Sequence, residues 1–365
     1  MRQVFAAMFA WLALAAPPAF AQEGASPRED LYARIVQRAV LDDLVPAYAA
    51  LDRQSGVLRD ALGAYCTSPS ERGGDVVRTG FADLLTAWAG VDFVRFGPMA
   101  AESRLERFAF WPDVHGTAAR QLRQFLADKD TAVLDPGMLA KQSAAVQGLP
   151  ALESLLFRGD DALLTTPHPD VFRCRLAEAI AENLAAIASG AAGEWRDENG
   201  FRKLMLQPSA DNPLYRNHEE SLREVLRALL TGLEQMRDQR LYAALGTSPQ
   251  TSRAERAPYE ISGNALPYIR ASAIALRRFA AVAGIADVLP TEETRIASSI
   301  VSAFDTLDAS LDAAGPNLRA ALADPDLHKK LEQAALAIVA LRDLYQTRLA
   351  NAAQLTGGFN SLDGD

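Results

Sequence analysis

Residues 140–158 read AKQSAAVQGLPALESLLFR, and almost every position from Ala144 to Phe157 is apolar or small. A run of this kind is typical of a segment that is buried on most of its faces. The run contains one acid, Glu153. A carboxylate in apolar surroundings stays charged only if it has a cationic or metal partner, or several hydrogen bonds. We therefore expect the fold to be organised around this segment, with Glu153 as its most informative residue.

The rest of the chain predicts an all-α fold. Apolar residues make up 49% of the sequence, alanine is abundant, and the alternation of Val, Ile, Thr and Tyr that marks strands is nearly absent. Pro46 is expected to kink or split the first long helix. Helical spacing of apolar residues predicts helices over about 28–65, 75–91, 117–128, 136–147, 150–157, 170–189, 215–242, 264–283, 292–313 and 326–353.

The length of the chain exceeds that of one ordinary domain and favours two. The stretch from residue 189 to residue 212 is rich in Gly, Asp and Asn, which is the composition of a domain boundary. We expect an N-terminal helical bundle over residues 28–200 and a C-terminal bundle over residues 205–356, with a functional cleft between them.

The first residues have the pattern of a secretory signal peptide. Arg2 gives a positive start, residues 4–16 form an apolar stretch, and Ala19-Phe20-Ala21 is a cleavage site of the A-x-A type. Pro17 and Pro18 interrupt the apolar stretch, which is also too short for a comfortable membrane span. We expect cleavage after Ala21 and a mature chain in the periplasm, without a membrane span.

The cysteine count predicts one disulfide, between Cys66 and Cys174. An even count favours pairing in an oxidising compartment, and neither a CxxC motif nor a nearby histidine supports metal ligation instead. On the chain-entropy account, closing a loop of this length contributes roughly 4–5 kcal/mol.

Charge and missing motifs exclude several classes of function. The net charge of −9 argues against binding to nucleic acid or to anionic lipid. The segment His218-Glu219-Glu220-Ser221-Leu222 begins like a zinc-binding HExxH motif but ends in leucine. There is no CxxCH, P-loop or G-x-S-x-G motif. His218 and His328 are expected on solvated helix faces, and His115 in a loop.

Four stretches carry a resemblance to the imelysin family. Residues 148–153, GLPALE, resemble its GxHxxE signature, with Pro150 in the place of the histidine. Residues 110–113 (FWPD), 252–259 (SRAERAPY) and 358–365 (GFNSLDGD) are similar to other stretches of the family. The four occur in the family's order, so the chain is identified as a member, with an imelysin-like region over about residues 28–356.

The resemblance implies a metal site that this sequence has altered. In the family, the histidine and glutamate of the signature lie one helical turn apart and have been interpreted as metal ligands, but Pro150 offers no ligand atom. Glu153 could join Asp113 or Asp363 in a carboxylate-only site, which suits a hard ion such as ferric iron or calcium. The interpretation we favour over metal ligation is a structural Glu153 paired with Arg253 or Arg256 across the two bundles. The identity of any cofactor therefore stays open, and iron or another divalent cation is the option.

The resemblance also places other residues at the cleft. Trp111 and Asp113 resemble family positions that flank it, although a tryptophan before a proline equally suits packing. Tyr259 follows the two arginines and completes the expected ligand-binding set. The tail, residues 357–365, is expected to dock back on the body toward the cleft.

The expected function follows from the family and from the missing histidine. The family was named for peptidases thought to depend on a metal, and other members resemble iron-regulated or iron-uptake proteins. Nothing else in the sequence supplies a base, nucleophile or metal-bound water. We expect a non-catalytic periplasmic protein, associated with iron uptake, that binds a metal, small ligand or partner in the cleft. The alternatives are a metallopeptidase with altered ligands, in which Glu153 is catalytic, and an envelope interaction module for iron-transport or redox proteins; the oligomeric state stays open.

Overall fold

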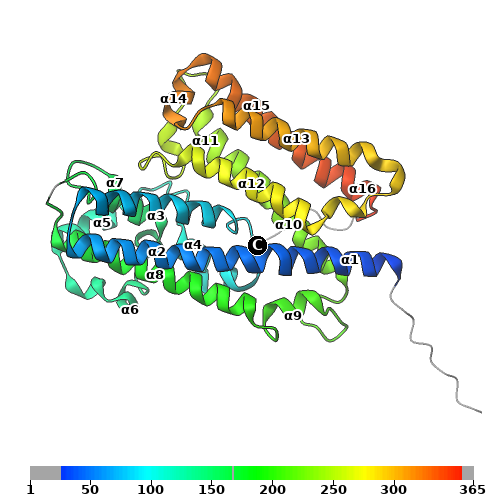
Figure 1. The fold of residues 1–365 in the computed structure, drawn as a ribbon, viewed down its shortest axis with the longest axis horizontal. Helices are drawn as coiled ribbons and strands as arrows, with labels where there is room; N and C mark the ends of the chain where they lie inside the picture. The colour runs from blue at the N-terminus through cyan, green and yellow to red at the C-terminus, as the bar shows by residue number, and fades with distance from the viewer. Residues whose placement is uncertain (1–25, 167, 356–365) are drawn as a thin grey trace, which may run out of the picture.

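Every regular element in the described part of the chain is a helix (Figure 1), which confirms the all-α prediction. The computed structural model describes residues 26–166 and 168–355. The predicted signal peptide, the predicted tail and Asp363 lie outside these residues. Within them, no helix combines the length and the apolar character that a membrane span requires.

The chain begins with a long rod made of three successive pieces. These are α1 (Pro27–Gln37), the π-helical segment η1 (Arg38–Leu44) and α2 (Val45–Thr67). Backbone torsions stay in the right-handed helical region at both joints. Pro46 lies in the first turn of α2. Because proline lacks an amide and its ring crowds the preceding turn, the wider π segment just before it lets the rod continue. Near Pro46, where we predicted a kink or a split, the rod changes from π-helical to α-helical geometry.

The first half of the chain packs around α2. This helix lies against α3 (Glu71–Ala89) and α8 (Val171–Arg196). Shorter elements follow α3 and surround this group: η2 (Gly97–Ser103), α4 (Arg104–Phe108), α5 (Thr117–Asp128), η3 (Thr131–Leu134), α6 (Pro136–Leu139), η4 (Ala144–Val146), α7 (Leu149–Phe157) and α9 (Phe201–Leu206).

The helix predicted over 75–91 is α3, Glu71–Ala89, and two other predicted helices of this half differ more clearly from the structure. The helix expected over 136–147 is wrong, because α6 and η4 are separate pieces. The Gln147 amide donates hydrogen bonds to the carbonyls of Ala140 and Gln142, which satisfies the turn between them. Conversely, α8 continues to Arg196, beyond the expected end at 189, because its last turns still bury alanines and Trp195.

Gly148 explains how the motif segment sits at the centre of the first half. A Cβ atom at this position would lie 2.4 Å from the carbonyl oxygen of Phe108. Only glycine permits such an approach of two backbones. The first residue of the GLPALE stretch therefore brings α7 against the end of α4.

The second half of the chain forms a second group of helices, which packs on the first. Its long helices pack in succession: α10 (His218–Gln235) on α12 (Ala265–Ala283), α12 on α13 (Thr294–Ala313), and α13 on α15 (Pro325–Asp343). The remaining elements are η5 (Met236–Leu241), a π segment, α11 (Tyr242–Leu245), η6 (Ala254–Arg256), η7 (Ile285–Val288), η8 (Thr291–Glu293), α14 (Leu318–Ala323), the π segment η9 (Leu344–Leu349) and α16 (Ala350–Ala352).

The two halves meet along a broad face (Figure 1). Helix α12 packs on α3 and η1, and α1 packs on α10. Asp43 of η1 accepts a hydrogen bond from Arg278 of α12 at 2.6 Å, and Glu29 of α1 accepts one from the His218 amide at 2.7 Å. Because α1 belongs by sequence to the first half but packs on the second, the boundary near residues 200–205 stays a prediction.

The predicted disulfide is present. Cys66 and Cys174 are bonded, and their Cα atoms lie 5.7 Å apart. Cys66 lies in the last turn of α2 and Cys174 in the first turn of α8, and these two helices pack side by side. The bond therefore fixes one end of the central helix pair.

Candidate functional site

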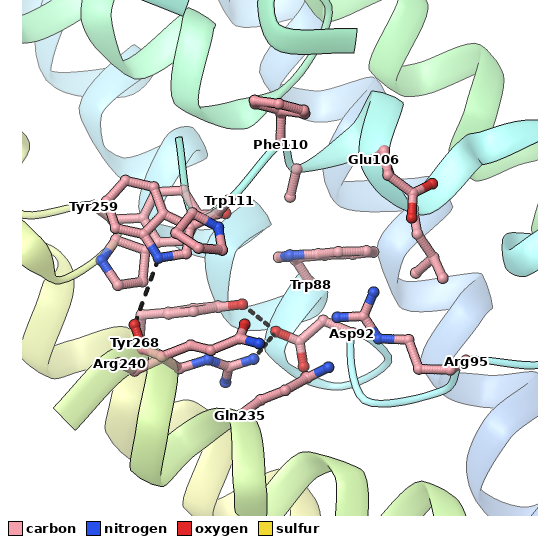
Figure 2. A pocket seen from close by; sticks show the side chains of 15 residues that line it. Trp88, Asp92, Arg95, Glu106, Phe110, Trp111, Gln235, Arg240, Tyr259 and Tyr268 are labelled. Atoms are coloured by element: carbon pink, nitrogen blue, oxygen red, sulfur yellow. Dashed lines mark hydrogen bonds and ion pairs between the residues drawn. The ribbon is translucent and has the colours of Figure 1, made fainter. Parts of the chain in front are cut away.

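A pocket with a cavity of about 140 Å³ lies where the two halves of the chain meet. One side comes from the end of α3 and the segment around α4, and the other from α10, η5, the loop before α12, and α12 itself. The lining residues are Trp88, Asp92, Arg95, Leu105, Glu106, Ala109, Phe110, Trp111, Pro112, Gln235, Gln239, Arg240, Pro258, Tyr259 and Tyr268 (Figure 2).

Aromatic rings form one part of this pocket. Trp88 is buried at the end of α3, and its ring contacts Phe108 in a tilted arrangement, with the ring centroids 4.6 Å apart. Phe110 and Trp111 follow on an extended segment and are partly exposed. Tyr259 is buried and contacts Tyr268 edge to face, with centroids 4.7 Å apart. Figure 2 shows the Trp88 ring between Phe110 on one side and the polar groups of the pocket on the other.

A buried ion pair forms the polar floor of the pocket. Arg240 donates a hydrogen bond to Asp92 at 2.5 Å, and both side chains are almost fully buried. The Tyr268 hydroxyl donates a second hydrogen bond to the same Asp92 oxygen. The Arg240 guanidinium also lies over the Tyr268 ring, 4.7 Å from its centroid, which is cation–π distance. The pair joins the end of α3 to η5 and α12.

The π segment η5 accounts for the position of Arg240. Residues 215–242 have the spacing of one amphipathic helix, and a regular α-helix places a new residue every 100° around its axis. In the structure, the last turns widen into η5, which changes the faces that Gln239 and Arg240 occupy. As a result, Arg240 is buried while its neighbour Gln239 stays exposed at the pocket.

Burial controls the protonation of the pocket's acid and phenols. It raises the pKa of Asp92 above its usual value, and Arg240 is the main opposing influence. Burial also raises the pKa values of Tyr259 and Tyr268 well above their usual value, so both phenols stay protonated. Tyr268 can therefore act only as a neutral hydrogen-bond donor toward Asp92.

The other charged groups of the pocket lie nearer its rim. Arg95 and Glu106 are exposed. In the orientation that its neighbours dictate, the Gln235 amide oxygen accepts two hydrogen bonds from Arg95, at 2.5 Å from Nη2 and 2.9 Å from Nε. Two acids and two arginines line the pocket, so their formal charges cancel.

Glu153 lies behind the pocket wall and not in its lining. It is 3% exposed, and its Oε1 atom accepts hydrogen bonds from the Ser262 amide at 2.9 Å and the Ser262 hydroxyl at 2.7 Å. Burial raises its pKa to about 7, although the hydrogen bonds from Ser262 lower it. The Ser262 hydroxyl also reaches the carbonyl oxygen of Tyr259 at 3.1 Å. Glu153 therefore holds the loop that carries Tyr259.

The predicted arginine partner of Glu153 is wrong. Arg253 is exposed and donates to the carbonyls of Gln250 and Ser252, at 3.3 and 2.7 Å. Arg256 is also exposed, and neither arginine forms an ion pair with Glu153 in the described residues. An acid with a pKa near 7 needs no cation if a serine supplies two donors, which is what the loop before α12 offers.

Two of the three carboxylates expected to bind a metal already accept hydrogen bonds in the structure. Both oxygens of Asp113 accept backbone amides at the start of α5, from Thr117 and Ala118 at 2.8 Å each. Glu153 is held by Ser262, and Asp363 lies outside the described residues. Residues 26–166 and 168–355 contain no group of three or more His, Cys, Asp or Glu side chains arranged to hold a metal ion.

Two histidines lie elsewhere than expected. His328 is 2% exposed, with Nε2 3.0 Å from the carbonyl oxygen of Leu245, so its predicted position on a solvated face is wrong. His218 Nδ1 lies 2.8 Å from Glu29, which ties the start of α10 to α1. His115 is exposed, as a loop residue should be.

The sequence analysis identified only part of the pocket. Trp111 and Tyr259, expected at the cleft, do line it, whereas Asp113, Arg253 and Arg256 do not. Asp92 and Arg240 were missed. Asp92 is the single acid in the otherwise apolar run Val91–Val94, and a single acid in an apolar run is also the pattern that pointed to Glu153. That pattern would have found the acid, but not its partner 148 residues away.

Glu153 makes the stability of the protein depend on pH. Its pKa of about 7 exceeds the ordinary 4.5, so between these values the folded state binds more protons than the unfolded state. The free energy of unfolding therefore falls as the pH rises through this window, by roughly 3 kcal/mol at most. Glu153→Gln keeps an acceptor for Ser262 without this titration. We expect the free energy of unfolding of the variant, relative to that of wild type, to increase from pH 5 to pH 8.

Urea unfolding at both pH values measures this gain. Glu255→Gln, a change at an exposed acid in the adjacent loop, is the matched control and should not alter the difference between the two pH values. A Glu153→Gln variant whose stability follows wild type across the range would show that the Glu153 carboxyl does not titrate there.

Fold and pocket together define an all-helical protein with a polar, aromatic pocket lined by residues from both halves of the chain. The sequence matches the imelysin family over residues 44–345, and the chain belongs to that family. A search of curated proteins gave no match.

Two solved structures share the fold. An imelysin-like protein from Psychrobacter arcticum 273-4 superposes with a TM-score of 0.74 at 20% identity, covering 91% of this chain and 98% of its own. A "putative iron-regulated protein A precursor" from Parabacteroides distasonis ATCC 8503 gives a TM-score of 0.71 at 12% identity, covering 90% and 97%. At these identities the likeness concerns the fold alone.

Proposed function

We propose that this imelysin-family protein is a non-catalytic periplasmic binding protein associated with iron uptake, and that the pocket at Asp92 and Arg240 holds its ligand or a group of its partner. The observation that carries the proposal is the paired state of this pocket. Asp92 is engaged by Arg240 and Tyr268, and Arg95 by Gln235. A general base or a nucleophile needs a free, activated atom next to the reacting group. A preformed pocket with satisfied polar groups suits binding better than reaction.

Support for iron uptake and for export comes from outside the pocket. The family resemblance includes iron-regulated and iron-uptake proteins, and the Parabacteroides neighbour is described as iron-regulated. The leader over residues 1–21 has the pattern of a secretory signal. The metal site expected at Glu153, Asp113 and Asp363 receives no support, so the association with iron does not require an ion at Glu153.

The proposal is tested by growth under iron limitation in the bacterium that encodes the protein. We expect deletion of the gene to slow growth when a chelator limits iron, and wild-type protein to restore it. Trp111→Ala should fail to restore growth because it opens the pocket wall. Val114→Ala, at a neighbouring side chain that is 76% exposed, is the matched control. Equal growth of the deletion strain and wild type would end the link to iron.

A metallopeptidase is the second candidate, and one observation favours it. The pKa of Glu153, about 7, is in the range that a general base needs. Purified full-length protein should be incubated with unfolded casein, with and without added ferrous, ferric or zinc ions. We expect no cleavage and no metal binding that depends on Glu153. Cleavage abolished both by a chelator and by Glu153→Gln would establish the peptidase instead.

A further inference from the structure

We propose, building on the binding role above, that the pocket at Asp92 and Arg240 takes a single neutral aromatic ring with a polar edge. The ring could come from a small aromatic molecule or from a Tyr or Trp side chain of a partner, because both present the same chemistry. Three properties of the pocket carry this inference: its size, its walls and its charge.

The size of the cavity fits one ring. Its volume is about 140 Å³. An engineered protein cavity of about 150 Å³ holds one benzene molecule, whereas sites for drug-sized ligands usually measure about 300–1,000 Å³. A large iron chelate or a folded peptide segment therefore exceeds the cavity, whereas a single ring fits it.

The walls of the pocket are suited to the faces and edges of a ring. Trp88, Phe110, Trp111 and Tyr259 contribute aromatic surface from both halves of the chain. Aromatic pairs gain stabilisation beyond their buried area when the rings stack with an offset or meet edge to face. Figure 2 shows the Trp88 ring between Phe110 and the ion pair, with Trp111 and Tyr259 to one side of it. A saturated ring of equal volume would not gain this contribution.

The charges of the pocket favour a neutral ring. Asp92 pairs with Arg240 on the floor, and the formal charges of Arg95 and Glu106 at the rim cancel, so neither sign of charge is in excess. On the floor of the pocket, a benzoate or a benzylammonium ion would lose its hydration without gaining an unpaired counterion, because Asp92 and Arg240 neutralise each other. Arg95 and Glu106 are exposed, so water and salt screen their charges. A hydroxyl or an indole N–H, in contrast, can reach the exposed polar groups of Gln239 and Glu106 at the rim. Phenol and indole are therefore the simplest probes.

The experiment measures binding of small probes to the full-length protein by ligand-detected NMR and by tryptophan fluorescence. We expect phenol and indole to bind with dissociation constants of order 1 mM. Cyclohexanol, benzoate and benzylamine should bind at least tenfold more weakly. Trp111→Ala should weaken phenol and indole tenfold or more, Trp111→Phe should retain most binding, and Val114→Ala should change nothing.

A second set of probes separates the two sources of the ring. If N-acetyltyrosine amide binds as well as phenol, a partner's side chain fits; if only the free rings bind, the ligand is a small molecule. Either result supports the inference. It is overturned if folded protein, checked by circular dichroism, binds neither phenol nor indole, if cyclohexanol binds equally well, or if a charged ring binds more tightly. If Trp111→Ala fails to restore growth but the wild-type protein binds no aromatic ring, the inference about the ligand is wrong and the proposed function stands. If the protein binds the ring but deletion of its gene has no effect under iron limitation, the inference about the ligand stands and the proposed link to iron is wrong.

Discussion

Replacing both Cys66 and Cys174 by alanine is expected to lower the free energy of unfolding by about 4–5 kcal/mol. The bond closes a loop with a sequence separation of 108 residues. On the chain-entropy account, a loop of about 100 residues restricts the unfolded chain by about 4.7 kcal/mol, and alanine removes this restriction. Urea unfolding of the double variant against wild type measures the loss.

Wild-type protein in reducing agent is the control for the alanine side chains themselves. It should unfold at nearly the same urea concentration as the double variant, because both lack the bond and keep the packing of α2 on α8. Equal stability of the double variant and oxidised wild type would mean that the unfolded chain is already compact between these residues.

The second large effect is expected for Arg240→Ala, with a loss of about 3–5 kcal/mol. Arg240 is 6% exposed and pairs with Asp92, which is 3% exposed. Removing the guanidinium leaves a buried carboxylate without its cation, and this penalty is larger than the value of the intact pair. Thermal or urea unfolding of the variant is the measurement.

Two further variants make this prediction specific. Replacing both partners, as Asp92→Leu with Arg240→Met, should cost much less than Arg240→Ala because no unpaired charge remains. Arg348→Ala removes an exposed ion pair, with Asp343 at 2.8 Å, and should change stability by less than about 1 kcal/mol. A loss for Arg240→Ala as small as that for Arg348→Ala would show that water reaches Asp92.

The sequence predicted those features of the fold that depend on local pattern. The helices over 117–128 and 264–283, the burial of Glu153 and the pairing of the two cysteines follow from apolar spacing, composition and count. The predicted ends of a helix were wrong where side-chain hydrogen bonds set them. The turn between α6 and η4 depends on the Gln147 amide, which bonds carbonyls five and seven residues earlier in the chain. Helix propensities describe single residues, so they do not predict these hydrogen bonds.

The pocket was harder to predict because distant segments build it. Trp111 was named from its motif, but Asp92, Arg240 and Tyr268 come from three elements that meet only in the folded chain. The position of Arg240 also depends on the π segment η5, whereas its sequence has the spacing of a regular amphipathic helix. The partner of Glu153 was predicted wrongly for a related reason. A serine amide and hydroxyl satisfy the acid from a loop whose path the sequence does not specify.

The first helix has a consequence for the order in which the protein matures. Glu29 of α1 bonds the His218 amide, 189 residues later, and Arg28 bonds the Ala353 carbonyl, 325 residues later. A ribosome therefore completes α1 long before either partner exists, and its apolar residues Tyr32, Ile35 and Val36 stay uncovered in the meantime. Nascent chains that stop before α10 present this helix to chaperones and proteases, so incomplete products should be cleared while finished chains persist.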